Sequence, residues 1–273
     1  MSRNPLRLSS SRLDQPMTNA CPIEPPSKAF HEAMSNEVYI RERLQPRFRD
    51  IDYLHLKDLL DFMTLVASKA EGEVFDYGCG CAPYRGLFSH CKSYIGADIA
   101  SSQAVDRILN DDGMTQEPSE SYDTVLSTQV LEHLKEPRLY LGECHRLLRR
   151  NGELILTTHG QFEEHGCPYD FQRWTCRGLE ELVETSGFEV IESGKLTTEM
   201  RAFVQLLNQM VLHLRCPDHR VLHIHLAVLR KAYVRFLRPV LNWFAGTFNH
   251  QGRVEGSNRS SLYVCVFVRA RKR

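Results

Sequence analysis

The stretch Glu73–Phe88, EVFDYGCGCAPYRGLF, joins a short apolar run to a turn that contains two glycines and a proline. Residues 74–77 carry mainly β-branched and aromatic side chains, which is typical of a buried strand. Gly78 and Gly80 then allow positive φ angles and a close approach of the backbone to a ligand. Residues 84–90 are predicted to form a helix whose first N–H groups face an anionic group. This pattern is typical of a nucleotide-binding turn, although a lone glycine turn also fits a plain connection between a strand and a helix.

The sequence around this turn alternates between strand and helix patterns. Further strands are predicted at residues 93–99, 106–109, 122–128, 153–158 and 188–193. Helices are predicted within 39–70, at 140–148 ending at Asn151-Gly152, and at 179–183 ending at Gly187. The alternation predicts an α/β fold, with a doubly wound and mostly parallel sheet that has helices on both faces.

The last third of the chain departs from this alternation. Residues 200–248 show helical patterns only, and residues 261–270, SLYVCVFVRA, form one long β pattern with no helix after it. This seventh strand is expected to enter the sheet late, antiparallel and beside an earlier strand. The predicted organisation is a tail at 1–36, a core at 37–197, a helical insertion at 198–250 and a final core strand at 251–273.

The composition excludes several classes of protein. Lys plus Arg equals Asp plus Glu, at 34 each among 273 residues, so no basic surplus indicates a nucleic-acid partner. The nine cysteines include no pair of CxxC motifs, so reduced thiols are expected, without a disulfide framework or a structural metal site. The sequence also has neither a secretory h-region nor a run of ~18–20 apolar residues. A cytoplasmic protein is therefore expected.

A second acidic residue narrows the choice of ligand. Asp98 follows the next predicted strand, where an acid commonly accepts hydrogen bonds from ribose hydroxyls. This spacing suits either a nicotinamide dinucleotide or S-adenosylmethionine. A dinucleotide fingerprint has a third glycine where this chain has Pro83, which lacks an N–H group and is less suited to a pyrophosphate. Pro83 and the late final strand favour S-adenosylmethionine.

Five segments together resemble the class I S-adenosylmethionine-dependent methyltransferases, and above all their bacterial small-molecule type (type 11). They are DYGCGCAPYRGLF, YIGADI, YDTVLSTQVLEHLKEP, LLRRNGELILTT and PYDFQRWTCRGLEELVETSGFEVI, which span residues 73–193 in order. The resemblance implies a Rossmann-like fold, S-adenosylmethionine as cofactor, and methyl transfer to a small-molecule or glycan- or lipid-linked acceptor.

The resemblance also implies roles for individual residues at the cofactor. Asp76 would brace the glycine turn, Asp98 would bind the ribose, and Asp111, or Asp112 in an alternate register, would lie near the adenine. Gln129 would contact the methionine end, while Glu132-His133 would fix its loop. Two departures are Ala82 in place of a glycine, and residues 115–118 in place of Leu-Pro-Phe. The full predicted cofactor set is Asp76, Gly78, Cys79, Gly80, Asp98, Ile99, Asp111 and Gln129.

The segment after the fifth strand holds the candidate acceptor residues. Methyl transfer needs mainly alignment and exclusion of water, and an oxygen acceptor profits from a nearby base. The candidates are His159, His165, Asp170 and Arg173. Asp170 and Arg173 are also spaced to pair with each other in a purely structural role.

The helical insertion carries two apolar stripes. One includes Phe203, Met210 and Leu214, and the other runs through residues 226–244 with basic residues opposite it. We expect a lid on the core or a homodimer face, with peripheral membrane contact through residues 221–248 as the alternative. The histidines at 219, 223 and 225 are spaced for a metal, but none is expected there.

Three other functions stay open at this stage. The chain would be a regulator or partner subunit if it binds S-adenosylmethionine without turnover. A nicotinamide-dependent oxidoreductase is opposed by Pro83. A nucleic-acid methyltransferase lacks support, because residues 127–130 read STQV instead of an Asn/Asp-Pro-Pro-Tyr/Phe motif.

Overall fold

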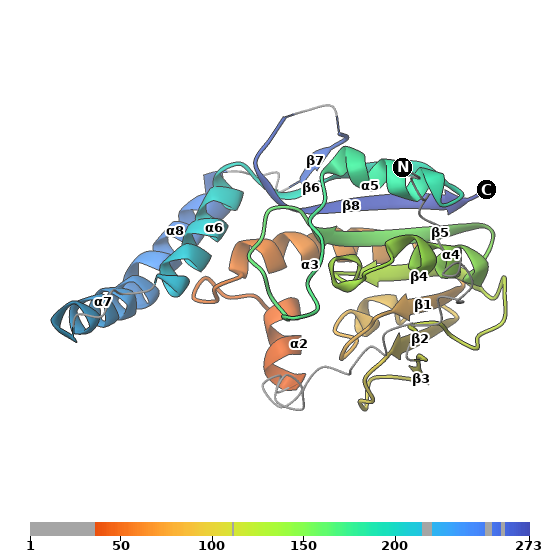
Figure 1. The fold of residues 1–273 in the computed structure, drawn as a ribbon, viewed down its shortest axis with the longest axis horizontal. Coiled ribbons are helices and arrows are strands. Elements are labelled where there is room, and N and C mark those ends of the chain that lie inside the picture. Colours follow the sequence, from red (N-terminus) through yellow and green to blue (C-terminus); the bar gives the residue numbers. More distant parts are fainter. Residues whose placement is uncertain (1–35, 111, 215–219, 249–252, 258–259) are drawn as a thin grey trace, which may run out of the picture.

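The computed structural model describes residues 36–110, 112–214, 220–248, 253–257 and 260–273. The predicted tail therefore falls outside the described residues except for Asn36, and so does Asp111. A single sheet of eight strands runs through the described core in the order β3-β2-β1-β4-β5-β8-β6-β7 (Figure 1). The predicted α/β class with a mostly parallel sheet is confirmed.

The first five strands form the parallel half of this sheet. They are β1 (Glu73–Tyr77), β2 (Ser93–Asp98), β3 (Arg107–Ile108), β4 (Tyr122–Thr128) and β5 (Leu148–His159). Strand β1 pairs in parallel with β2 on one side and with β4 on the other. The strand order therefore reverses at β1, and the carboxyl ends of β1, β2 and β4 meet at one edge, where ligands bind in open α/β sheets.

The final strand, β8 (Tyr263–Lys272), enters the sheet late, as predicted. It lies antiparallel between β5 and β6 (Phe188–Thr198). Residues Val264–Val268 are completely buried, because both edges and both faces of this strand are covered. A short eighth strand that was not predicted, β7 (Arg253–Glu255), pairs with β6 at the edge.

Helices cover both faces of the sheet. On one face, α4 (Pro137–Leu147) and α5 (Cys176–Thr185) bury their apolar sides, and on the other face α3 (Tyr53–Ala67) does so. Ahead of α3, α2 (Asn36–Leu44) lies beside the carboxyl ends of the strands (Figure 1). Burial of these apolar faces supplies most of the stability of such layers.

Two local predictions were wrong. Residues 84–90 form only η1 (Arg85–Phe88), a single 3₁₀ turn, because the guanidinium of Arg85 bonds the carbonyls of Tyr94 and Ala104 and so fixes the chain close to β2. The helix N-terminus expected beside the glycine turn is therefore missing from these residues. Asn151-Gly152 does not end α4 either, because β5 already begins at Leu148 and Asn151 adopts a φ of 65° within that strand.

The insertion forms a helical arm that extends from one end of the sheet (Figure 1). Its elements are α6 (Met200–His213), α7 (Arg220–Ala232), the π-helical turn η3 (Tyr233–Leu237) and α8 (Arg238–Phe248). A buried ion pair, Arg201 Nη2 to Asp58 Oδ1 at 2.6 Å, fixes α6 to α3. The irregular turn η3 ends two residues before Pro239.

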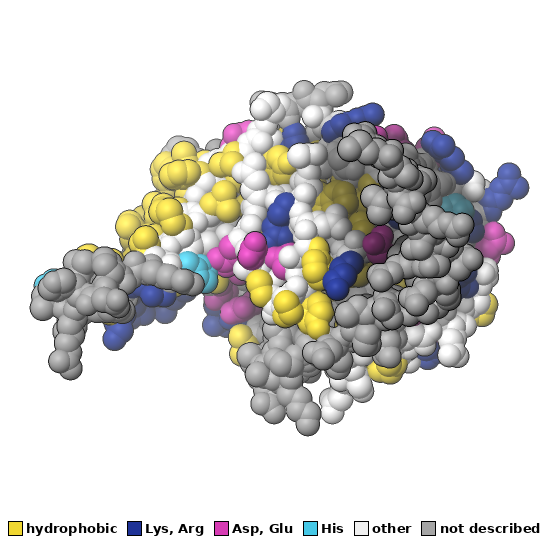
Figure 2. All heavy atoms as spheres, in the orientation of Figure 1, with side chains coloured by type: hydrophobic (Ala, Val, Ile, Leu, Met, Phe, Trp, Pro, Cys, Tyr) yellow, Lys and Arg dark blue, Asp and Glu magenta, His cyan; other side chains and the backbone are white. Residues whose placement is uncertain are grey.

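The apolar stripe of α6 faces away from the core, whereas Leu241 of α8 packs against a small buried cluster with Val204. The side chains of Phe203 and Met210 are 56% and 57% exposed, whereas Gln205 and Asn208 on the opposite face of α6 are completely buried. Asn208 accepts a hydrogen bond from Tyr233 Oη at 2.6 Å and donates one to Asn242 Oδ1 at 2.9 Å. Buried polar groups thus join the helices, and apolar side chains gather on the outer surface over α6 and α8 (Figure 2).

Candidate cofactor and acceptor site

The glycine turn leaves β1 at the point where the strand order reverses. Gly78 has a φ of 84°, and its N–H donates to Ala97 O in β2 at 2.8 Å. A Cβ atom on Gly78 would lie 2.6 Å from Val130 Cγ2, so glycine is required there, whereas the space beside Gly80 is open. Ala82 adopts a φ of 47°, a left-handed conformation that costs a non-glycine residue about 1–2 kcal/mol.

Asp98, at the end of β2, closes this turn from the other side. Its Oδ2 accepts a hydrogen bond from Gly80 N at 2.8 Å, and its Oδ1 accepts one from Ala100 N at 3.1 Å. The adjacent Ile99 is exposed. The structure therefore brings together the predicted acid and the predicted glycine turn, with the carboxylate at the sheet edge where a ribose would lie.

Asp76 is buried beneath the turn and acts from within the sheet. It accepts a hydrogen bond from Tyr94 Oη, and burial raises the pKa of its carboxyl group to about 7. Cys79 is buried too, and burial raises the pKa of its thiol. Both side chains are thus enclosed by the protein next to the turn, and the bracing role of Asp76 stays a prediction.

Helix α2 brings two further residues to the turn, Tyr39 and Arg43, which no pattern in the sequence indicates. The guanidinium carbon of Arg43 lies 3.4 Å from the centroid of the Tyr39 ring. Burial raises the pKa of Tyr39 and of Cys81, and the positive charge of Arg43 partly offsets this increase in both groups. Arg43 is therefore a cation near the glycine turn, suitable for the carboxylate of an amino-acid ligand.

Gln129 follows β4 in a left-handed conformation, with a φ of 57°. Its Nε2 donates to Thr157 Oγ1 at 3.2 Å, and its buried Oε1 has no hydrogen-bond partner among the described residues. An acceptor for a ligand ammonium group is thus available at the predicted position. Asp112, the alternate adenine residue, accepts a hydrogen bond from Met114 N at 2.9 Å.

The acceptor side of the site is a cluster of rings beyond the end of β5. His159 and Phe162 stack with centroids 4.0 Å apart, and the ring of His165 stands perpendicular to that of His159 at 4.9 Å. His55 of α3 completes the cluster, with its centroid 5.2 Å from that of His159. His55 was missed because nothing in its own helix distinguishes it, and only the tertiary fold brings it here.

The histidines of this cluster are neutral at physiological pH. Burial lowers the pKa of His55 to about 3 and that of His159 well below its ordinary value. Burial also lowers the pKa of His165, with the neighbouring Asp170 carboxylate acting in the opposite direction. Each neutral imidazole keeps one nitrogen lone pair for a ligand.

Glu132, in the 3₁₀ turn η2 (Leu131–His133), lies completely buried below these rings. Its Oε2 accepts a hydrogen bond from Thr158 Oγ1 at 2.7 Å, and its Oε1 lies 3.5 Å from His159 Nε2. This carboxylate was expected only to fix its loop. The structure also places it in contact with a predicted catalytic histidine.

Asp170 and Arg173 form the structural pair that was the alternative to a catalytic role. Arg173 Nη1 and Nη2 each donate to the Asp170 carboxylate at 2.6 Å. Although burial acts in the opposite direction, these hydrogen bonds and the positive charge of Arg173 lower the pKa of Asp170 to about 2. An acid this strong is a poor general base. Arg173 also donates to Glu163 O at 2.7 Å, so the pair holds the loop around the histidines.

These residues fit S-adenosylmethionine at three places. The open space beside Gly80 leaves room for the backbone of a ligand, and the Asp98 carboxylate faces the same turn. The Arg43 guanidinium is suited to the carboxylate of a methionine moiety. The unpartnered Oε1 of Gln129 is suited to its ammonium group. Asp111, the predicted adenine residue, lies outside the described residues.

Known proteins agree with this assignment. Residues 47–193, more than half of the chain, match the family model of a methyltransferase domain. A ubiquinone biosynthesis O-methyltransferase of Xanthomonas oryzae pv. oryzae is 29% identical over 118 residues, which cover 36% of this chain and 48% of that protein. A protein of the same name from Pseudomonas aeruginosa is 26% identical over 149 residues, with 48% and 61% covered. The chain thus spans about half the length of the first of these relatives.

A solved structure shows the same fold. It is a SAM-dependent methyltransferase, "possible histamine N-methyltransferase", from Thermotoga maritima, with a TM-score of 0.53, 16% identity, and coverage of 90% of this chain and 100% of that one. The glycine turn by itself is compatible with either a nicotinamide dinucleotide or S-adenosylmethionine, and the match to the methyltransferase family identifies S-adenosylmethionine as the cofactor. The protein therefore belongs to the class I family of S-adenosylmethionine-dependent methyltransferases.

Proposed function

We propose that the protein transfers a methyl group from S-adenosylmethionine to a hydroxyl oxygen of a small-molecule acceptor. The observation that carries this proposal is the buried cluster of neutral histidines and Glu132 next to the glycine turn. Lone pairs on imidazole and carboxylate accept the hydrogen of a hydroxyl group, whereas a protonated amine would need its charge neutralised first. The two relatives are both named O-methyltransferases, which supports oxygen as the acceptor atom.

The residues of the chain supply binding, orientation and a dry environment. The bound cofactor supplies an activated methyl group, so little covalent work is left to the protein. The stacked rings of His159 and Phe162 form a flat wall against which a planar acceptor can lie. Gln129 and Arg43 fix the methionine end, and Glu132 and the histidines hold the hydroxyl hydrogen in the space beyond β5. Alignment of this kind accounts for a large share of the barrier in transfer reactions.

Transfer of a labelled methyl group tests this proposal. Purified protein is incubated with labelled S-adenosylmethionine and with phenols and catechols, each matched to the amine of the same shape. We expect label on the hydroxyl compounds, and a decrease of about 100-fold in the rate for His159→Ala with binding of S-adenosylhomocysteine retained. Label on the amines alone would contradict the oxygen assignment. Cofactor binding without transfer to any acceptor would favour the non-catalytic regulator.

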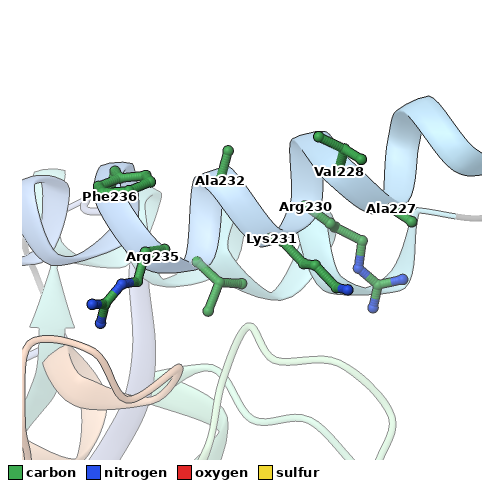
Figure 3. Close-up of a pocket in the computed structure, with 8 residues that line it drawn as sticks. Ala227, Val228, Arg230, Lys231, Ala232, Arg235 and Phe236 are labelled. Atoms are coloured by element: carbon green, nitrogen blue, oxygen red, sulfur yellow. The ribbon is translucent and has the colours of Figure 1, made fainter.

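We further propose that the outer face of the arm docks on an anionic membrane surface. Residues 200–248 contain seven Lys or Arg and a single acid, Asp218, and among these basic side chains Arg201 and Arg238 are buried. Phe236 is 70% exposed and Trp243 53% exposed. A pocket along α7 and η3 has Arg235 with Arg230 and Lys231 on one side and Phe236 on the other (Figure 3). An amphipathic arm with exposed aromatic side chains on one side and cations on the other suits the interface of an anionic membrane. No helix of the described residues is long and apolar enough to cross a membrane.

Co-sedimentation with vesicles tests the docking surface. We expect binding to vesicles that contain phosphatidylglycerol, weak binding to pure phosphatidylcholine, and loss of binding for Phe236→Glu. Leu139→Glu is the matched control, because Leu139 is equally exposed, at 67%, but lies on α4 of the core. A dimer that Phe236→Glu dissociates, together with no vesicle binding, would support the homodimer face instead. If Phe236→Glu changed neither vesicle binding nor the oligomeric state, both the membrane surface and the homodimer face would be contradicted. A lid on the core would then be the remaining interpretation.

A further inference from the structure

Glu132, His159 and His165 converge at one point of the acceptor side. They come from η2, from the end of β5 and from the loop that follows it, and one ligand atom of each lies within 4.8 Å of the other two. Two of the three side chains, those of Glu132 and His159, are almost completely buried. Residues so far apart in sequence meet only because the folded loop brings them together.

The cluster has a polar atom that nothing in the described chain satisfies. Glu132 Oε1 is buried and has no hydrogen-bond partner among the described residues. The closest basic side chain in the loop, Arg173, is already paired with Asp170. A buried polar atom left without a partner costs free energy, so the unsatisfied oxygen of Glu132 beside two imidazole rings indicates a missing ligand at this point.

The distances suit a metal ion better than a hydrogen bond. Glu132 Oε1 and His159 Nε2 are 3.5 Å apart, beyond the usual hydrogen-bond distance. Two ligands bound at ~2.1 Å to a tetrahedral zinc ion lie about 3.4 Å from each other. The perpendicular rings of His159 and His165 allow nitrogen atoms from two directions to point at the same centre.

The surrounding groups are arranged as around metal ligands. Thr158 Oγ1 donates to the second oxygen of Glu132, which leaves Oε1 free to bind. Asp170 Oδ2 lies 3.4 Å from His165 Nδ1 and also accepts the His165 backbone N–H at 2.8 Å. A carboxylate behind a histidine orients its ring and selects the tautomer that binds through the other nitrogen. The Asp170–Arg173 pair thereby acquires a role as the outer support of His165.

We propose that Glu132, His159 and His165 bind one divalent transition-metal ion of the zinc type. Two imidazoles and one carboxylate are a borderline ligand set, which suits Zn²⁺ or Co²⁺ and not Mg²⁺. Three protein ligands leave a position for an oxygen of a second molecule. The role of the ion rests on the proposed function: held by Glu132, His159 and His165, it would replace their direct hydrogen bonds to an acceptor hydroxyl group, lower the pKa of that group and so favour the oxyanion that receives the methyl group.

Titration of the chelator-treated protein with Co²⁺ and Zn²⁺ tests this proposal. We expect saturation at one Co²⁺ per chain, a visible absorption band that Zn²⁺ removes, and no competition by Mg²⁺. Glu132→Gln and His165→Ala should each weaken binding at least ~100-fold. His90→Ala is the control and should bind Co²⁺ like the wild type, because His90 bonds Ala70 O away from the cluster. Circular dichroism and binding of S-adenosylhomocysteine verify that each variant is folded.

The outcomes separate this inference from the proposed function. No saturable binding of Co²⁺ or Zn²⁺ to the wild type, or equal binding by the Glu132→Gln and His165→Ala variants, would overturn the metal site. Methyl transfer to hydroxyl acceptors that persists after chelation would leave the proposed function intact without the metal. A tight Co²⁺ site in a protein that transfers no methyl group would support the metal site and contradict the function.

Discussion

Gly78 is the residue on which the shape of the cofactor turn depends most directly. Its φ of 84° favours glycine, and a Cβ atom would lie 2.6 Å from Val130 Cγ2. We therefore expect Gly78→Ala to lower the free energy of unfolding by about 2–4 kcal/mol, from backbone strain and overpacking together. Urea denaturation measures this change. Gly86→Ala is the control, because its Cβ would have no neighbour within 4 Å, and an equal loss in both variants would contradict the assignment.

Asp76 gives the apo protein a specific dependence of stability on pH. Burial raises the pKa of this carboxyl group to about 7, whereas in the unfolded chain it titrates near ~4. The folded state therefore holds a proton that the unfolded state has lost, so the contribution of Asp76 to stability is full below pH ~4 and is lost as the pH rises through 7. Relative to the Asp76→Asn variant, the free energy of unfolding of the wild type should decrease by roughly 4 kcal/mol between pH ~4 and pH 7.

Urea denaturation of both proteins at several pH values between 4 and 8 measures this difference. The asparagine side chain retains an oxygen that can accept the hydrogen bond from Tyr94, so the comparison isolates ionisation. A difference between the two proteins that stays constant with pH would show that Asp76 has an ordinary pKa.

Single residues differed in how far the sequence could predict their place in the site. Gly78 and Asp98 were predicted because their distance from strand ends has a known geometric meaning, and the structure joins them through the hydrogen bond from Gly80 N to Asp98. Arg43 and His55 were not, since each lies on a helix whose pattern indicates only packing. Their approach to the site depends on tertiary contacts of α2 and α3, which no local spacing encodes.

At the scale of elements, the joint between α3 and α6 depends on a buried ion pair. Arg201 and Asp58 lie 2.6 Å apart, and each side chain is only 6% exposed. Arg201→Met should lower the free energy of unfolding by about 3–5 kcal/mol, because it leaves the Asp58 carboxylate buried without a partner. In the double variant Asp58→Leu/Arg201→Met, the free energy of unfolding should decrease by much less than the sum of the decreases in the two single variants.

A neighbouring exposed pair provides the control for this cycle. Lys57 and Asp61 are also ion-paired but are 40% and 60% exposed, so Lys57→Ala should change the stability by less than ~1 kcal/mol. Thermal or urea denaturation gives all of these values. Additive losses in the cycle would mean that Arg201 and Asp58 do not stabilise each other.

The elements also show where patterns fail. Strands with long apolar runs, such as β4 and β8, were predicted. Strand β7 was not, because three residues are too few to show a strand pattern. The apolar stripe of α6 is present, but it faces outward, because Arg201, Gln205 and Asn208 form the buried side of α6. Periodicity identifies an amphipathic helix without saying which face is covered, and a set of satisfied polar contacts can determine that choice.

At the scale of the whole molecule, stability should be distributed unevenly between the sheet and the arm. Strand β8 is paired on both edges and its centre is completely buried, whereas Val228 and Leu229 of α7 are more than 60% exposed. Hydrogen exchange should therefore be slowest in β5 and β8 and fastest, among the described helices, in α7. Equal protection of α7 and β8 would contradict this, unless it disappears on dilution and so reveals an oligomer.

The order of the strands places the site, and the sequence predicted this order only in part. Reversal at β1 brings the ends of β1, β2 and β4 together, and insertion of β8 beside β5 closes the sheet next to His159. The late strand followed from the absence of a helix after it. Its position between β5 and β6 depends on long-range pairing, which a linear pattern does not specify.

Calorimetric titration with S-adenosylhomocysteine tests whether the turn between β1 and β2 binds S-adenosylmethionine. We predict one site per chain for S-adenosylhomocysteine, no binding of NADH, and affinity at least ~10-fold weaker for Asp98→Ala, which loses the carboxylate that faces the ribose and holds Gly80. Binding of NADH, no binding of S-adenosylhomocysteine to the wild type, or unchanged affinity in the folded Asp98→Ala variant would contradict this assignment of the cofactor site.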